Sequence, residues 1–156
     1  MSTALARLDS YFGAWRDRLC EDSAEVRFTA QALDAPTGLH FAQADSFVTS
    51  LGYTPIGGNW ELLDAEAGAG EPRSARTALV EAFAKNMVFT GKAWLGEDAA
   101  LAMAGDFLAC FDPGTRQIVT NRMYFGWNPI TTATFEWAFV AFDDTAIALL
   151  LATDKD

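Results

Sequence analysis

Apolar residues near the start of the chain recur at steps of three and four. They are Leu5, Leu8, Phe12, Trp15 and Leu19. Residues with this spacing lie on one side of a helix, and Ser2 or Thr3 is suited to cap its start. The pattern therefore predicts an opening helix over residues 5–19 that packs on the protein with this stripe.

The pattern then changes to alternation. Apolar residues occupy every second position from Val26 to Ala32, between polar neighbours, which is typical of a half-buried strand. A turn segment at 34–38 precedes a shorter alternation at Leu39 and Phe41, so we predict a first hairpin here. A short helical turn over 45–51 is expected after it, with Gly52 at its end.

The middle of the chain alternates between loop and helix signals. We expect a brief strand over 60–63 and a loop over 65–73, which is rich in small and polar residues. Ser74 is placed to cap a helix that reaches Met87. A second, alanine-rich helix is predicted over 97–104, with Gly105 as its stop signal.

The final third favours strands. Segments 107–111 and 117–121 flank an Asp-Pro-Gly-Thr turn and predict a second hairpin. Segments 132–142 and 145–153 flank Asp143 and Asp144 and predict a third. Because every residue from Ala146 to Ala152 is apolar, we expect this last strand to be central and covered on both faces.

These elements together predict an α+β fold. We expect a single antiparallel β-sheet built from hairpins, with two or three α-helices packed against one face. The 156 residues are close to the commonest domain size, so one globular domain over residues 1–156 is expected.

The charge of the chain narrows the classes of partner. Twenty-one acidic and 11 basic residues give a formal net charge of −10, which repels nucleic-acid backbones and anionic lipid. We therefore predict neither a nucleic-acid nor a membrane partner. An acidic surface speeds association with a basic protein, although many soluble proteins are simply acidic.

Cysteine usage and hydropathy indicate the compartment. Cys20 and Cys110 have no metal-ligand spacing, and two isolated cysteines are typical of free, buried thiols in a reducing compartment. The N-terminal residues contain no uninterrupted apolar run, and no segment has the roughly 18 apolar residues of a membrane span. We predict a cytoplasmic protein.

The sequence lacks most of the common catalytic and metal-binding motifs. His40 is the only histidine, which rules out zinc motifs that need two, and no nucleophile elbow or phosphate-binding glycine loop is present. His40 is predicted on the solvent side of a strand, with a role as general base as the alternative. Asp143 and Asp144 are interpreted as a turn, with a metal site as the alternative. We predict no catalytic residue, metal or cofactor, and favour a protein that is not an enzyme.

Two segments combine large aromatic residues with loop residues. Exposed Trp and Tyr are favoured contact residues of protein interfaces, and the alternative is that these rings close one end of the core. The candidate binding residues are Tyr124, Phe125 and Trp127 in one segment and Tyr53, Asn59 and Trp60 in the other.

Three functions remain open at this point. The favoured hypothesis is a bacterial protein that binds and inhibits another, basic protein, as an immunity protein does with a toxin. The second is a small-ligand protein or enzyme with a pocket between helices and sheet, lined by Trp60, Tyr124 and Trp127 with Glu136 or Asp106 as its carboxylate. The third is a structural or adaptor subunit of a homo-oligomer.

Overall fold

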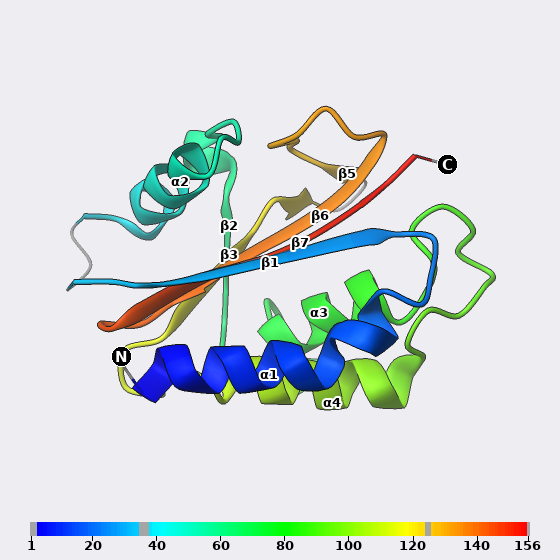
Figure 1. Cartoon of the computed structure of the whole chain (residues 1–156), viewed down its shortest axis with the longest axis horizontal. Coiled ribbons are helices and arrows are strands. Elements are labelled where there is room, and N and C mark those ends of the chain that lie inside the picture. Colours follow the sequence, from blue (N-terminus) through cyan, green and yellow to red (C-terminus); the bar gives the residue numbers. More distant parts are fainter. Residues whose placement is uncertain (1–2, 35–37, 124–125, 156) are drawn as a thin grey trace.

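Figure 1 shows the computed structural model of the chain, which describes residues 3–34, 38–123 and 126–155. These residues contain four α-helices, one 3₁₀-helix and seven strands. The helices are α1 (Thr3–Leu19), α2 (His40–Ser50), α3 (Ala75–Phe83) and α4 (Glu97–Leu108), with the 3₁₀-helix η1 at Gly57–Asn59. The strands are β1 (Glu25–Ala32), β2 (Glu61–Leu63), β3 (Gln117–Thr120), β4 (Arg122–Met123), β5 (Gly126–Trp127), β6 (Phe135–Phe142) and β7 (Ala146–Asp154).

Five strands form one antiparallel sheet in the order β1-β7-β6-β3-β2. β6 and β7 form a hairpin that pairs from Phe142 opposite Ile147 to Phe135 opposite Asp154. β7 lies between β6 and β1, and all its residues from 146 to 152 are buried. The predictions of a final hairpin and of a central last strand are therefore confirmed.

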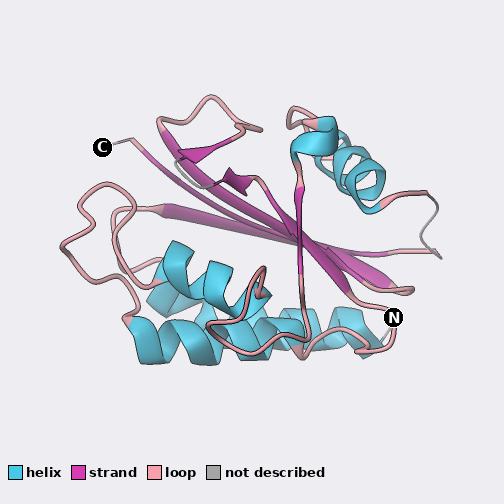
Figure 2. Ribbon diagram, turned by 180° about the vertical axis from the view of Figure 1, so that it is seen from behind, coloured by secondary structure: helices cyan, strands magenta, loops and turns pink. Residues whose placement is uncertain are grey.

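Helices cover both faces of this sheet (Figures 1 and 2). α1, α3 and α4 lie on one face, where Phe83, Phe107 and Phe139 are fully buried in the larger core cluster. α2 lies on the other face, where Phe47 and Val48 are part of a second cluster with residues of β6 and β7. The predicted α+β architecture is confirmed, and α2, of which only a short turn over 45–51 was predicted, adds a layer on the second face.

The first predicted hairpin is not formed. Residues 40–50 are helix α2, and β1 pairs with β7 instead of with the segment around Leu39 and Phe41. Ala44, Phe47 and Val48 are buried at helical spacing within an 11-residue helix of about three turns, whereas the alternation at Leu39 covers only three residues. His40 is accordingly the first residue of a helix rather than part of a strand.

The second predicted hairpin is also wrong. α4 continues through Gly105 to Leu108, because Met103, Ala104, Phe107 and Leu108 extend one buried helical stripe. Burial of these side chains outweighs the cost of about 1 kcal/mol for a glycine inside a helix. β3 pairs with β2 on one side and with β6 on the other.

The opening helix α1 matches its prediction closely. Leu8, Trp15 and Leu19 of the predicted stripe are buried, and Ala4 and Tyr11 are buried beside them. Both cysteines are free thiols. Cys110 is buried as expected, but Cys20, which directly follows α1, is exposed.

Helix α3 begins as predicted and ends early. Ser74 caps it, since its hydroxyl accepts a hydrogen bond of 3.2 Å from the backbone N–H of Thr77. The helix ends at Phe83 rather than at Met87. Just beyond it, the side-chain oxygen of Asn86 accepts hydrogen bonds from two following backbone N–H groups and so holds a tight turn.

Candidate functional site

The predicted aromatic segment after β3 forms a small sheet of its own. β4 and β5 pair antiparallel, with Arg122 opposite Trp127 and Met123 opposite Gly126. Tyr124 and Phe125, two candidate binding residues, lie outside the described residues. The hairpin lies beside β6 (Figure 1), and Trp127 of β5 contacts residues near the start of that strand.

Trp127 packs against two aromatic residues of β6. Its ring meets Trp137 edge to face, at 5.5 Å between centroids, and lies 5.9 Å from the ring of Phe135. All three rings are half-buried, whereas Met123 is 52% exposed. We call the surface formed by Arg122, Met123, Trp127, Phe135 and Trp137 the aromatic patch.

Arg122, also a member of the aromatic patch, has a mostly buried side chain. Its guanidinium carbon is 4.4 Å from the centroid of the Trp137 ring, a cation–π contact. One nitrogen donates to the carbonyl of Ala78 at 3.3 Å and is 3.8 Å from the carboxylate of Glu81. Burial lowers the pKa of Arg122, against the opposing effect of Glu81, and its buried Nε has no acceptor among the described residues.

A groove adjoins the aromatic patch on the side of β2 and α3. It has a volume of about 600 Å³ and is lined by Glu61, Leu62, Leu63, Arg73, Ala78, Glu81, Thr120, Arg122 and Met123. The carboxylates of Glu61 and Glu81 are mostly exposed and each faces an arginine at the long distance of 3.8 Å. Such pairs are weak, so both carboxylates remain available to a cationic partner.

A buried polar network fastens the hairpin to the main sheet. Asn121, which joins β3 to β4, donates to Glu136 at 2.5 Å and to the carbonyl of Asn128 at 3.0 Å. Its own side-chain oxygen accepts from the backbone N–H of Ala138 at 2.8 Å. Because β6 carries Glu136 and Ala138, the hairpin is anchored to a rigid strand.

Glu136, a candidate pocket carboxylate, is the centre of this network. Its side chain is 0% exposed, and it also accepts hydrogen bonds from the N–H of Ile130 and from the N–H and hydroxyl of Thr131. These contacts hold the loop between β5 and β6. Glu136 therefore has a positioning role and does not line an open pocket.

The second aromatic segment is differently placed. Trp60 is only 3% exposed, and its indole N–H donates to Asp45 at 2.8 Å. Asp45 also accepts from the N–H groups of Ile56 and Gly57, so this segment is tied to α2. Tyr53 is half-buried and Asn59 is exposed. Burial of Trp60 corrects the expectation that this ring offers contact area.

The described rings of the two aromatic segments pack on opposite faces of the sheet. Trp60 and Tyr53 pack in the cluster on the α2 face of the sheet, whereas Phe135 and Trp137 pack on the face covered by α1, α3 and α4. One backbone hydrogen bond, from Thr54 to Ile130 at 3.0 Å, connects the segments. The neighbours of Trp127 are Phe135, Trp137 and Arg122. Phe135 and Trp137 are two residues apart on β6, and this alternation in the sequence could have indicated that both rings lie on one face of the strand.

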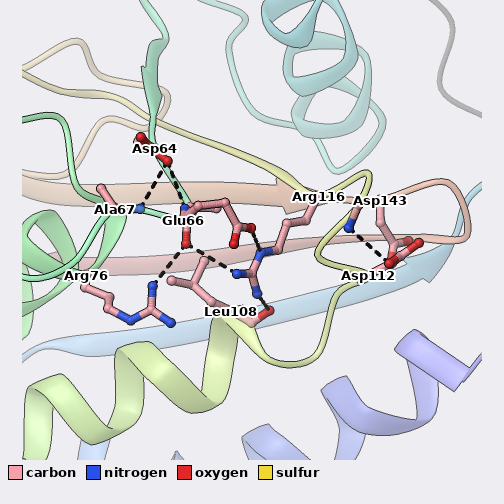
Figure 3. A network of polar contacts seen from close by, with 10 residues as sticks. Asp64, Glu66, Ala67, Arg76, Leu108, Asp112, Arg116 and Asp143 are labelled. Carbon is pink, nitrogen blue, oxygen red and sulfur yellow. Dashed lines mark hydrogen bonds and ion pairs between the residues drawn. The ribbon is translucent and has the colours of Figure 1, made fainter.

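A second polar cluster surrounds Arg116, which the sequence analysis did not single out (Figure 3). Its side chain is 9% exposed and donates to Glu66 at 2.7 Å, to the carbonyl of Leu108 at 2.8 Å and to that of Ala65 at 3.4 Å. The hydrogen bond from Arg116 lowers the pKa of Glu66. Every nitrogen of this guanidinium donates a hydrogen bond within the chain. Arg116 therefore holds the loop before α3 against the end of α4 and is not placed to bind an anion.

Asp143 occupies the turn between β6 and β7, as interpreted from the sequence. Its carboxylate accepts from the N–H groups of Asp112, Thr145 and Ala146 at 2.8 to 3.0 Å. Partial burial raises the pKa of Asp143, but these hydrogen bonds outweigh it and the net pKa is lowered. Within the described part of the chain, no group of three or more His, Cys, Asp or Glu residues is placed to hold a metal ion.

None of the helices within the described ranges is long and apolar enough to cross a membrane. Comparisons of the chain with protein-family models, with curated proteins and with solved structures found no match.

Proposed function

We propose that this protein binds another protein through the aromatic patch. The observation that carries the proposal is the exposed side chain of Met123 on the same hairpin as Trp127, whose half-buried ring packs with those of Phe135 and Trp137. Trp, Met and Arg are enriched at protein interfaces, and Trp and Arg are the commonest residues with large contributions to binding energy. Their concentration on one hairpin supports a contact surface.

The support beneath this surface favours tight binding. Arg122, Asn121 and Glu136 fix the hairpin through stacking and buried hydrogen bonds. A surface that is already ordered loses less conformational entropy when a partner docks. Docking on these rings therefore carries a smaller entropy cost than docking on a mobile loop.

Charge indicates the kind of partner. The chain has a net charge of −10, and the groove beside the patch presents the mostly exposed carboxylates of Glu61 and Glu81. Such a surface steers a basic protein toward the patch and repels acidic ones. We propose an inhibitory role of the immunity type, in which the partner is a basic toxin and binding blocks its activity.

Affinity capture with paired variants tests this function. Met123→Lys places a positive charge in the middle of the patch, and Leu101→Lys makes the same kind of change on α4, where Leu101 is also exposed. The immobilised wild-type protein and the Leu101→Lys control should retain the same basic protein from cells that express this chain. Met123→Lys should weaken its retention by about 30-fold, the equivalent of roughly 2 kcal/mol.

Two outcomes of this capture experiment would contradict the proposal. Equal retention by all three proteins, with all three folded by circular dichroism, contradicts a role of the patch in binding. Retention of an acidic partner contradicts the electrostatic part of the proposal.

A further inference from the structure

An open trough lies between α1 and α4, on the side of these helices away from the sheet. Its volume is about 520 Å³, and its lining residues are Thr3, Ala6, Arg7, Ser10, Tyr11, Ala14, Trp15, Asp106, Ala109 and Cys110. Ala6, Ser10 and Ala14 are exposed and spaced by four, so they form a stripe of small residues along α1. Small side chains allow the backbone of another helix to approach closely.

A buried polar group without a partner lies beneath this trough. Tyr11 is 5% exposed, and its hydroxyl has no hydrogen-bond partner among the described residues. The ring packs on Phe28 and Phe107, at 5.7 and 5.3 Å between centroids. Burial raises the pKa of the hydroxyl, and the nearby Cys110 and Asp106 raise it further. Tyr11, Asp106 and Cys110 all line the trough, but the hydroxyl oxygen itself is covered.

The missing partner has a physical consequence. A buried hydroxyl without an acceptor costs about 1 to 3 kcal/mol, whereas phenylalanine would make the same ring contacts without this cost. Tyr11 is thus poorly explained by packing within one chain. The hydroxyl oxygen has almost no accessible area, so a polar atom from outside satisfies it only if side chains that line the trough shift when a partner docks.

Charges at the two ends of the trough are opposite. Asp106 lies at the end near Trp15, whose indole N–H donates to it at 2.9 Å. Arg7 lies near Cys110, close enough to lower the pKa of that thiol against the larger raising effect of burial. Arg7 and Trp15 are eight residues apart on α1, or about 12 Å along the helix. If the trough of a second copy packs on this one in the opposite direction, Arg7 of each copy faces Asp106 of the other copy.

We propose that the trough receives α1 of a second copy of this chain, antiparallel to the first, in a two-fold dimer. A two-fold contact uses the same surface on both copies and requires it to be self-complementary, as the positions of Arg7 and Asp106 make it. Ser10 is the polar residue of the small stripe and, after a shift of the lining side chains, supplies a hydrogen-bonding partner for Tyr11 of the other copy. The two pairs of helices α1 and α4 then form a four-helix layer.

The distribution of charge over the helices favours this arrangement in an acidic protein. α1 carries three arginines and two aspartates, whereas α4 carries three acidic residues and no basic one. In the proposed dimer each α1 lies against α4 of the other copy, so a basic helix meets an acidic one. The contact therefore avoids the repulsion that a net charge of −10 imposes on other faces.

Sedimentation velocity over about 1 to 200 μM protein tests the proposal. Ala14→Arg fills the trough with a long, charged side chain, and Ala42→Arg is its matched control on an exposed position of α2, on the other face of the sheet. The wild type and Ala42→Arg should change from monomer to dimer within this range. Ala14→Arg should remain monomeric, or dissociate at least about tenfold more readily.

The variant Tyr11→Phe distinguishes an effect of the hydroxyl on dimer formation from an effect on folding stability. The variant keeps the ring contacts and should be at least as stable as the wild type in dilute solution, yet its dimer should dissociate several-fold more readily. A wild-type protein that stays monomeric throughout overturns the proposal, as does an Ala14→Arg variant that dimerises normally. An unchanged dimer of Tyr11→Phe overturns the role assigned to the hydroxyl.

Discussion

The substitution Glu136→Ala probes the network that anchors the aromatic patch. It removes the acceptor of four hydrogen bonds, two of which come from the buried amide of Asn121 and the buried N–H of Ile130. Each buried donor left without an acceptor costs about 1 to 3 kcal/mol. With the small cavity left by the side chain, we expect a loss of about 4 kcal/mol in the free energy of unfolding.

Urea unfolding followed by far-UV circular dichroism measures this loss. Glu136→Gln is the matched control, because the amide has a similar shape but keeps only one acceptor oxygen, and it should cost about half as much. Hydrogen exchange should show that the amides of Ile130 and Thr131 lose protection in Glu136→Ala before those of β7 do. A loss below about 1 kcal/mol would refute the conclusion that Glu136 holds this loop.

Three further predictions concern other parts of the structure. Trp15→Ala should lower the free energy of unfolding by about 3 to 5 kcal/mol in urea titrations, because the buried indole also donates to Asp106; a cost under about 1 kcal/mol contradicts its burial. A thiol reagent should modify Cys20 in the folded protein, but Cys110 only after unfolding, because Cys110 is buried and burial raises its pKa to about 12. The lowered pKa of Asp143 means that its stabilising effect is complete above the unfolded-state pKa and is lost as pH falls through the lower folded-state pKa. The wild type should therefore lose more stability than Asp143→Asn between about pH 5 and pH 2, and parallel pH profiles would contradict this reasoning.

The parts of the fold that the sequence predicted have long, unambiguous patterns. α1 is marked by five apolar residues at helical spacing, and β7 is apolar from Ala146 to Ala152. The two failed hairpins arose from short patterns. Leu39 and Phe41 alternate over three residues only, and Gly105 suggested the end of a helix whose buried stripe continues to Leu108.

The candidate site could be predicted only in part, for a related reason. Trp127 was found because aromatic and loop residues are adjacent in the sequence. Its neighbours Phe135 and Trp137 come from another strand, and the stacking of Arg122 depends on how β4 leaves the sheet. Trp60 had the same local signature as Trp127, but the carboxylate of Asp45, 15 residues away, holds it in the core.

The central claim is that the aromatic patch binds a partner rather than only closing the core. The most direct test measures the Kd for the captured partner and the free energy of unfolding on the same Trp127→Ala variant. Trp127 is half-buried and contacts Phe135 and Trp137, so we expect a stability loss of about 1 kcal/mol. The Kd should rise by about 30-fold or more, mainly through faster dissociation. A stability loss above about 3 kcal/mol with an unchanged Kd would contradict the claim, because Trp127 would then be a core residue.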